Sequence, residues 1–374
     1  MTRPLVDMLR DAGPTRLAER DPDARAGVVL GTIAPGPFGP RLVQQEWRQD
    51  ASPPYFYPAS TVKLVATAAM LSWLGFAVPF DIDADRSHVR LHDHPSSPDS
   101  ASLGLLLRRI GAVSCNPSYN TLFDALGAAS FRALFARWGV FARITHQLSP
   151  AIPKPLEAYL HSPGATWTLH EREPGTGHVE LRTPPAIAEL PAGPSDPTEL
   201  VGRAHVLCSQ RHDGPMNFSP RNRIELADLQ RMLCAITTPQ AHGGLRLFLR
   251  DHARRVLVEA LTLTPREIAS LSGPQCLDAA EADLDDTWGK LFLAAARRSF
   301  PGLAIRHTSK FGQAYGFTTE NALLTAPGKP AVFLAATIHT NDGGIVGGDD
   351  YQYGRATEFF SGLAAAVLGE LWAL

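Results

Sequence analysis

Ser60 and Lys63 lie three residues apart where an apolar stretch of the chain begins. They belong to "FYPASTVKLVATAAML", residues 56–71, in which apolar residues recur at helical spacing. Residues three apart lie on one face of a helix, so the lysine amine would lie beside the serine hydroxyl. A serine hydroxyl is a weak nucleophile until a base removes its proton, and a lysine amine can be that base once burial lowers its pKa. The pair therefore predicts nucleophilic catalysis.

The same two residues also have a purely structural interpretation. Serine commonly caps a helix, and a lysine at a helix edge can extend its amine to water. A serine at a helix start also lies where unpaired backbone N–H groups favour negative charge. Only five of the 35 basic residues are lysine, the basic type that loses its proton when buried. These are Lys63, Lys154, Lys290, Lys310 and Lys329.

Two further motifs follow in the chain. "SCNPSYN" contains two Ser-x-Asn triplets, Ser114-Cys115-Asn116 and Ser118-Tyr119-Asn120. "TSKFG" places Lys310 on a predicted strand two residues before Gly312, where a missing side chain lets another segment approach closely. Ser-x-x-Lys, Ser-x-Asn and Lys-x-Gly in this order are typical of penicillin-recognising serine enzymes.

On these residues the chain resembles the superfamily of class A β-lactamases and penicillin-binding transpeptidases. "FYPASTVKLVATAAML" resembles the family's nucleophile helix, and "SLGLLLRRIGAVSCNPSYNTLFDALG" resembles the helix leading into its Ser-Asp-Asn loop. The resemblance covers about residues 24–150 and 215–374. It selects Ser114 and Asn116 over the second triplet, because Asn120 and Gly127 then match the family's downstream Asn and Gly.

The resemblance implies a role for each motif residue. Ser60 would be the acylated nucleophile, Lys63 its general base, and Ser114 the hydroxyl that passes a proton to the leaving amide nitrogen. The expected substrate-binding residues are Asn116 for the substrate amide, Lys310 for positive potential, and Gly312 and Gln313 on the strand. The backbone N–H groups of Ser60 and Gln313 would form the oxyanion hole. No metal or cofactor is implied.

Two departures from the family pattern bear on the substrate and on turnover. Phe311 stands where the family usually has a Thr or Ser whose hydroxyl binds the substrate carboxylate. Residues 150–215 lack the Glu-x-x-Leu-Asn segment whose Glu activates the deacylating water. Glu157 and Glu199 are the only loose candidates, and we expect neither to act. The expected function is a serine hydrolase acting on an amide, β-lactam or ester, and the alternative is a penicillin-binding sensor or transpeptidase-like module acylated without efficient turnover.

The elements that would position these residues divide into two groups. Strands are predicted in "AGVVLGTIAPG" and "RLVQQEW" near the start and in three successive runs after residue 300, with helices between. We expect an α+β fold with one antiparallel sheet from both chain ends, flanked by helices, and an inserted helical lobe. The expected divisions are an N-terminal helix (1–23), an α/β part (24–60 and 300–374) and the lobe (61–299), with a hairpin excursion at 150–215.

Composition restricts the partners and the compartment. A net charge of −2 gives no reason to expect nucleic acid or an anionic membrane. No run of about 18 uninterrupted apolar residues predicts a spanning helix, and the closest is the C-terminal segment with Glu358 and Glu370. The N-terminus lacks an apolar signal core, so the protein is cytoplasmic, or periplasmic or secreted if a leader was removed. We expect a monomer acting on a small molecule or a peptide.

Three other signals receive structural interpretations. The histidines of "HVRLHDH" (His88, His92 and His94) could ligate a metal with Asp93, but surface histidines are the expected state. Cys208 and Cys234 could pair, although free buried thiols are expected. His307 lies three residues before Lys310 and is either near the site or simply packed.

Overall fold

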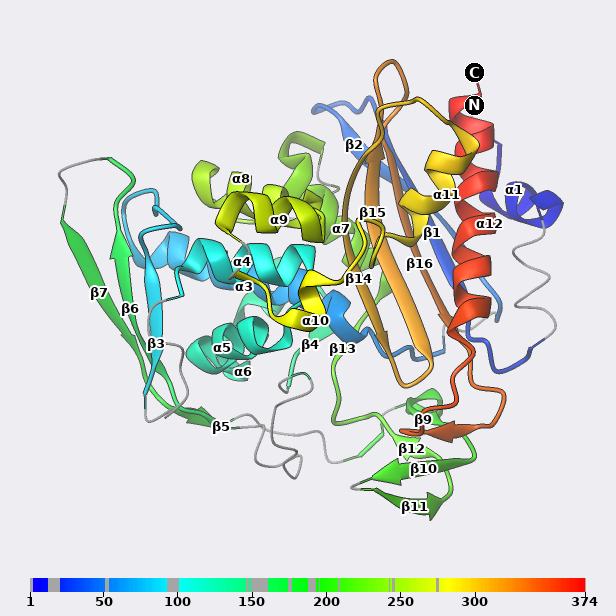
Figure 1. Ribbon diagram of the computed structural model, residues 1–374, viewed down its shortest axis with the longest axis horizontal. Helices are drawn as coiled ribbons and strands as arrows, with labels where there is room; N and C mark the ends of the chain where they lie inside the picture. Colours follow the sequence, from blue (N-terminus) through cyan, green and yellow to red (C-terminus); the bar gives the residue numbers. More distant parts are fainter. Residues whose placement is uncertain are drawn as a thin grey trace.

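A five-stranded antiparallel sheet with the order β14-β15-β16-β1-β2 forms the centre of the protein (Figure 1). Its strands are β1 (Gly27–Ala34), β2 (Arg41–Arg48), β14 (Arg306–Ala314), β15 (Phe317–Thr325) and β16 (Val332–His339). Pairing of β1 with β16 joins the two ends of the chain, which confirms the predicted α+β architecture. The computed structural model describes residues 3–12, 21–50, 54–92, 101–145, 148, 161–173, 177–187, 193–194, 196–207, 209–241, 243, 246–273 and 276–373.

Three helices pack on one face of this sheet (Figure 1): α1 (Leu5–Ala12), α11 (Leu291–Ser299) and α12 (Tyr353–Trp372). The lobe boundary expected near residue 299 lies too late in the chain, because Phe292 of α11 packs in one core with Phe360 of α12. The helix expected over residues 1–23 is confirmed for Leu5–Ala12, whereas residues 21–26 are not helical. Residues 13–20 lie outside the described residues.

The opposite face of the sheet is covered by α7 (Leu226–Thr237), which packs on β1, β15 and β16. Behind α7 lies α3 (Val62–Ala77), which has buried residues on nearly all of its sides. The stretch Ala59–Ala77 has the length and hydropathy (1.3) of a membrane span, but 83% of that window is buried inside the fold. It is more apolar than the C-terminal segment that was expected to come closest, because Lys63 is its only charged residue.

The helical lobe contains α4 (Leu103–Ala112), α5 (Asn116–Leu126), α6 (Ala128–Trp138), α8 (Asp251–Thr262), α9 (Pro265–Ser272) and α10 (Ala279–Ala282). The helix α4 begins at a serine cap, since Ser102 Oγ accepts a hydrogen bond from Leu105 N. Gly127 separates α5 from α6 at a φ of 79°, which glycine adopts without strain. These ends set the position of the Ser114 loop between α4 and α5.

The predicted hairpin excursion forms a small sheet beside the lobe (Figure 1). Strand β6 (Ala165–His170) pairs with both β7 (His178–Thr183) and β3 (His88–Leu91). Trp167 is fully buried against Trp73, so it packs in the core rather than lining a groove. The shorter strands are β4 (Ala142–Arg143), β5 (His161–Ser162), β8 (Ala186–Ile187), β9 (Leu200–Val201), β10 (Ala204–Leu207), β11 (Gln210–Asp213), β12 (Met216–Asn217), β13 (Arg223–Ile224) and β17 (Ile345–Val346).

Candidate active site

Ser60 lies in a short 3₁₀ turn, η1 (Ala59–Thr61), that runs directly into α3. The expected serine cap is therefore wrong: Pro58 precedes η1 and Thr61 precedes α3, and neither position has a side-chain cap hydrogen bond. The Thr61 hydroxyl instead donates to Pro58 O at 2.6 Å, which closes the turn. Ala59 has a φ of 45°, a conformation that costs a non-glycine residue energy and that often occurs at functional sites.

Lys63 is the most deeply buried polar group of the site, with no exposed surface. Its Nζ donates hydrogen bonds to the carbonyl oxygen of Ser114 and to Oδ1 of Asn116 at 2.7 Å, and it lies 3.2 Å from Ser114 Oγ. Because burial disfavours the ammonium form, the pKa of Lys63 falls to about 7. A large fraction of Lys63 is therefore neutral near pH 7, as a general base requires.

Ser114 stands between two buried amines. Lys310 Nζ donates to Ser114 Oγ at 2.9 Å and to Phe311 O at 2.9 Å. Burial, and after it the charge of Lys63, holds the pKa of Lys310 well below its usual value. Ser114 has a φ of 55°, so the loop between α4 and α5 is held in an unfavourable conformation. Side chains from α3, from this loop and from β14 thus form one hydrogen-bonded chain.

Gly312 brings the edge strand β14 against the turn that holds Ser60. A Cβ atom added at this position would lie 2.7 Å from both Pro58 O and Ser60 N. Such contacts are too close for any side chain, so only glycine lets the two backbones meet. Gln313 follows on the same strand, and its side-chain amide donates to Thr318 Oγ1 at 3.1 Å.

The structure thus places Ser114, Asn116 and Lys310 around Lys63, and Gly312 beside Ser60. The second triplet has other contacts: Ser118 Oγ donates to Cys115 Sγ at 3.2 Å. Within the described part of the chain, the hydroxyl of Ser60 forms no hydrogen bond, and the acceptors of Lys63 Nζ are on Ser114 and Asn116.

Leu148 is a residue near the site that the sequence did not reveal. Its backbone N–H donates to Asn120 Oδ1 at 2.8 Å, and its carbonyl accepts from Asn120 Nδ2 at 3.0 Å. Asn120 lies one helical turn after Asn116 on α5, so this segment returns close to the contact between Asn116 and Lys63. The side chain of Leu148 is apolar and 6% exposed. Among the described residues, no carboxylate is hydrogen-bonded to Lys63.

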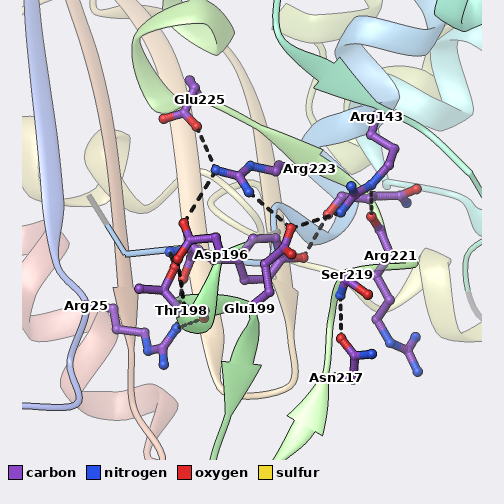
Figure 2. Close-up of polar contacts among 12 residues, drawn as sticks. Arg25, Arg143, Asp196, Thr198, Glu199, Asn217, Ser219, Arg221, Arg223 and Glu225 are labelled. Carbon is purple, nitrogen blue, oxygen red and sulfur yellow. Dashed lines mark hydrogen bonds and ion pairs between the residues drawn. The ribbon is translucent and has the colours of Figure 1, made fainter. Parts of the chain in front are cut away.

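The two glutamates considered as deacylating bases have different outcomes. Glu157 lies outside the described residues. Glu199 ends η3 (Pro197–Glu199) and is fully buried between two guanidinium groups (Figure 2). Its Oε1 accepts from Arg143 at 3.2 Å and from Arg223 at 3.0 Å, which is the arrangement of a structural ion pair.

An aromatic pair lies beside Lys310. The rings of Phe311 and Trp288 meet edge to face with centroids 6.0 Å apart. Gly289, at a φ of 65°, lets the turn before α11 pass within van der Waals contact of Phe311. Both aromatic residues line a narrow crevice that also includes Lys310 and the end of α4 at Gly111 and Ala112. Trp288 lies 22 residues from Lys310 in the sequence, so only a contact in the folded chain shows that it belongs beside the site.

The alternative signals do not form a metal site or a disulfide in the described part of the chain. No group of three or more His, Cys, Asp or Glu side chains there could hold a metal ion. His92 contacts Thr166 Oγ1 at 3.0 Å, and Asp93 and His94 lie outside the described residues. Cys234 is a buried free thiol, and Cys208 is outside the described residues.

Among solved structures, this chain is similar in fold to class A β-lactamases. A variant of the last common ancestor of class A β-lactamases of Gram-negative bacteria has a TM-score of 0.53 at 18% identity, with 98% of each chain covered. An ancestral class A β-lactamase has a TM-score of 0.51 at 16% identity, covering 98% of this chain and 99% of that chain. A β-lactamase from Burkholderia ambifaria has a TM-score of 0.51 at 15% identity, covering 96% and 99%.

No family model matches the sequence, and no curated protein matches it. At 15–18% identity, the structural likeness establishes the fold alone. The likeness extends over nearly the full length of both chains, so the predicted resemblance is confirmed at the level of fold. The chain has the α+β fold of class A β-lactamases.

Proposed function

We propose that the protein is a serine hydrolase that works by acyl transfer through an ester of Ser60. The observation that carries this proposal is the hydrogen-bonded chain from Lys310 through Ser114 to Lys63, beside the turn that holds Ser60. When Lys63 is neutral, its two N–H groups are taken by acceptors that have no proton to give, Ser114 O and Asn116 Oδ1. Its lone pair is then available to a hydroxyl proton.

The acylation step follows from these contacts. The proton of Ser60 passes to Lys63 as Ser60 Oγ attacks the substrate carbonyl carbon. The backbone N–H groups of Ser60 and Gln313 would hold the developing oxyanion, and one such donor is typically worth ~3 kcal/mol. Ser114 gives its proton to the leaving nitrogen or oxygen and regains one from Lys63, which restores the neutral amine. The hydrogen bond from Lys310 holds the Ser114 oxygen in place during this transfer.

The surroundings of Lys310 favour a substrate without a free carboxylate. The Lys310 amine already donates to Ser114 Oγ and to Phe311 O. Phe311 and Trp288 line the neighbouring crevice with aromatic carbon instead of a hydroxyl. A carboxylate held against these rings would lose hydration, and the Lys310 amine beside it is already engaged by two acceptors. We therefore expect neutral esters, amides or lactams to acylate Ser60 faster than substrates that carry an acid there.

The apolar side chain of Leu148 favours a second candidate function, in which the acyl-enzyme forms but is not quickly hydrolysed. It occupies a segment fixed next to the Asn116 contact with Lys63. A water molecule attacking the Ser60 ester needs a base, and a positioned base commonly contributes roughly 10²–10⁴-fold in rate. Without one, the ester would hydrolyse slowly or pass its acyl group to another acceptor. A penicillin-binding sensor or transpeptidase-like module would use this long-lived state.

Labelling with a fluorescent penicillin, read by intact-mass spectrometry, tests the nucleophile. Ser60→Ala should abolish the covalent adduct with the penicillin and with an active ester, because the other hydroxyl of the η1 turn, that of Thr61, is held by its hydrogen bond to Pro58 O. Ser118→Ala is the matched control, since this hydroxyl only donates to Cys115, and it should still be labelled. Full labelling of the Ser60→Ala variant would contradict the proposal.

Leu148→Glu should shorten the lifetime of the acyl-enzyme. The new carboxylate would lie on a segment whose backbone Asn120 fixes near Lys63, where it could activate water. We expect deacylation to accelerate by at least about tenfold, toward the effect of a positioned general base. The lifetime is measured by the loss of the adduct mass after excess penicillin is removed. Leu148→Gln controls for polarity, and equal lifetimes for the Glu and Gln variants would show that this position cannot supply a base.

Phe311→Thr should change the preference for charged substrates. Benzylpenicillin and its methyl ester differ only at the carboxylate, so the ratio of their acylation rates isolates this group. A hydroxyl at position 311 should raise the acylation rate with the acid relative to that with the methyl ester by about tenfold, the effect of one hydrogen bond to a charged group. Phe311→Leu, which stays apolar, should leave the ratio near that of the native chain. An unchanged ratio in Phe311→Thr would mean that Phe311 does not set the substrate charge.

A further inference from the structure

Behind the catalytic strand lies a buried charged cluster that the acylation mechanism does not use. It consists of Lys290 at the start of α11, Glu320 on β15 and His307 on β14, whose exposed fractions are 3%, 0% and 3%. Burying such groups is costly, and apolar side chains of the same volume are often as stable or more stable. A role beyond packing is therefore worth seeking.

The cluster is held by defined contacts. Glu320 Oε2 accepts from the backbone N–H of Phe292 in the first turn of α11 at 3.0 Å, where the helix dipole favours a negative charge. Its other oxygen, Oε1, lies 3.2 Å from His307 Nε2. Lys290 Nζ donates to Leu261 O of α8 at 3.3 Å. One carboxylate is thus fixed against α11, and one amine spans from α11 to the helical lobe.

This cluster lies on the other side of β14 from the site. Glu320 is directly opposite Phe311 in the ladder, whereas Lys310 is opposite Asn321. Residues that are opposite in a ladder share a face and neighbours alternate, so Glu320 faces away from Ser114 while Lys310 faces toward it. The crevice beside Phe311 is lined by both Lys290 and Lys310, so residues of the cluster and of the site border the same space.

The charges do not balance when all the amines are protonated. Lys63, Lys290 and Lys310 are buried, and Glu320 is the carboxylate whose charge acts on both Lys310 and Lys290. Burial and the neighbouring charges of Lys63 and Lys290 lower the pKa of Lys310, and Glu320 opposes this. Burial also lowers the pKa of Lys290, to about 8.

Weaker fields reach the same groups from the other packed elements. Arg297 of α11 acts on Lys290 and His307, Glu267 of α9 acts on Lys290, and Cys115 and Glu281 act on Lys63. The charges that act on Lys310 itself are those of Lys63, Lys290 and Glu320.

We propose that Lys290 and Glu320 are positioning residues whose opposite charges set how fully the Lys310 amine is protonated. Through the Ser114 hydroxyl that lies between the two amines, Lys310 in turn sets how fully Lys63 is protonated. Neither Lys290 nor Glu320 touches a reacting atom. The pair acts through the field at Lys310, with Lys290 favouring the neutral amine and Glu320 favouring the charged one. The consequence for catalysis rests on the proposed function of Ser60, but the electrostatic linkage itself does not.

The small number of lysines makes this inference directly measurable. Selective ¹³Cε labelling of lysine gives five signals, one for each lysine of the chain, and single replacements assign them. Titration of the Lys310 signal then gives its midpoint without any substrate. Failure of Ser60 labelling and failure of this titration are therefore separate outcomes.

Removal of each charge should move the Lys310 midpoint in opposite directions. Lys290→Met should raise it and Glu320→Gln should lower it, each by about one pH unit, a common effect of one nearby charge. The double variant should return toward the native value. A purely structural cluster would predict lower stability in both variants without midpoint shifts of opposite sign.

The matched control is Lys290→Arg, which keeps the positive charge and should leave the Lys310 midpoint at or below the native value. This comparison with Lys290→Met also decides the question if Glu320→Gln does not fold. Equal midpoints in the Met and Arg variants, or shifts of the same sign after removal of Lys290 and of Glu320, would overturn the inference.

Discussion

The burial of the Lys63 amine is the constraint on which the rest of the site depends. Transfer of an ammonium group from water to a protein interior costs several kcal/mol even after relaxation. The chain reduces this cost by offering Ser114 O and Asn116 Oδ1 as acceptors, and by letting the amine lose its proton at a pKa of about 7. The same desolvation that makes the lysine expensive to bury also lowers its pKa, as the proposed role of base requires.

The packing of the helical lobe against the sheet provides the buried environment of Lys63. Lys63 projects from α3 in the core, Ser114 and Asn116 come from the junction of α4 and α5, and Lys310 comes from the edge of the sheet. Close packing of β14 on the Ser60 turn is possible because Gly312 has no side chain. Ala59 and Ser114, two of the residues with a positive φ, lie in the segments that meet here.

Much of the fold could be predicted from the sequence, because its signals are local. Alternating and helical periodicities gave the strands at both chain ends and the helices between, and Ser102 and Gly127 marked helix ends. The motifs themselves are short and local, but the choice of Ser114 and Asn116 over the second triplet came from the resemblance to a known family. The 3₁₀ turn at Ser60 was missed because Pro58 and Thr61 close it through a contact that no periodicity reports.

The rest of the site depends on contacts between distant segments. Leu148 acquires its place only because Asn120 fixes its backbone, and Trp288 only because Gly289 lets a turn approach Phe311. The assignment of α11 to the lobe failed because its apolar face fits α12 as well as any lobe helix would. Lys290 and Glu320 are both buried but lie 30 residues apart, so no local pattern places them in one cluster.

The pH dependence of Ser60 acylation tests most directly whether a buried, neutral Lys63 is the base. The acylation rate with a neutral chromogenic ester should be measured between about pH 5 and pH 9, because general-base catalysis follows the fraction of deprotonated base. A protonated Lys63 cannot accept the serine proton, so the rate should fall as the pH falls and reach a plateau above a midpoint near 7. A rate that keeps rising tenfold per pH unit without a plateau, or an unchanged profile in Lys63→Met, would contradict the account.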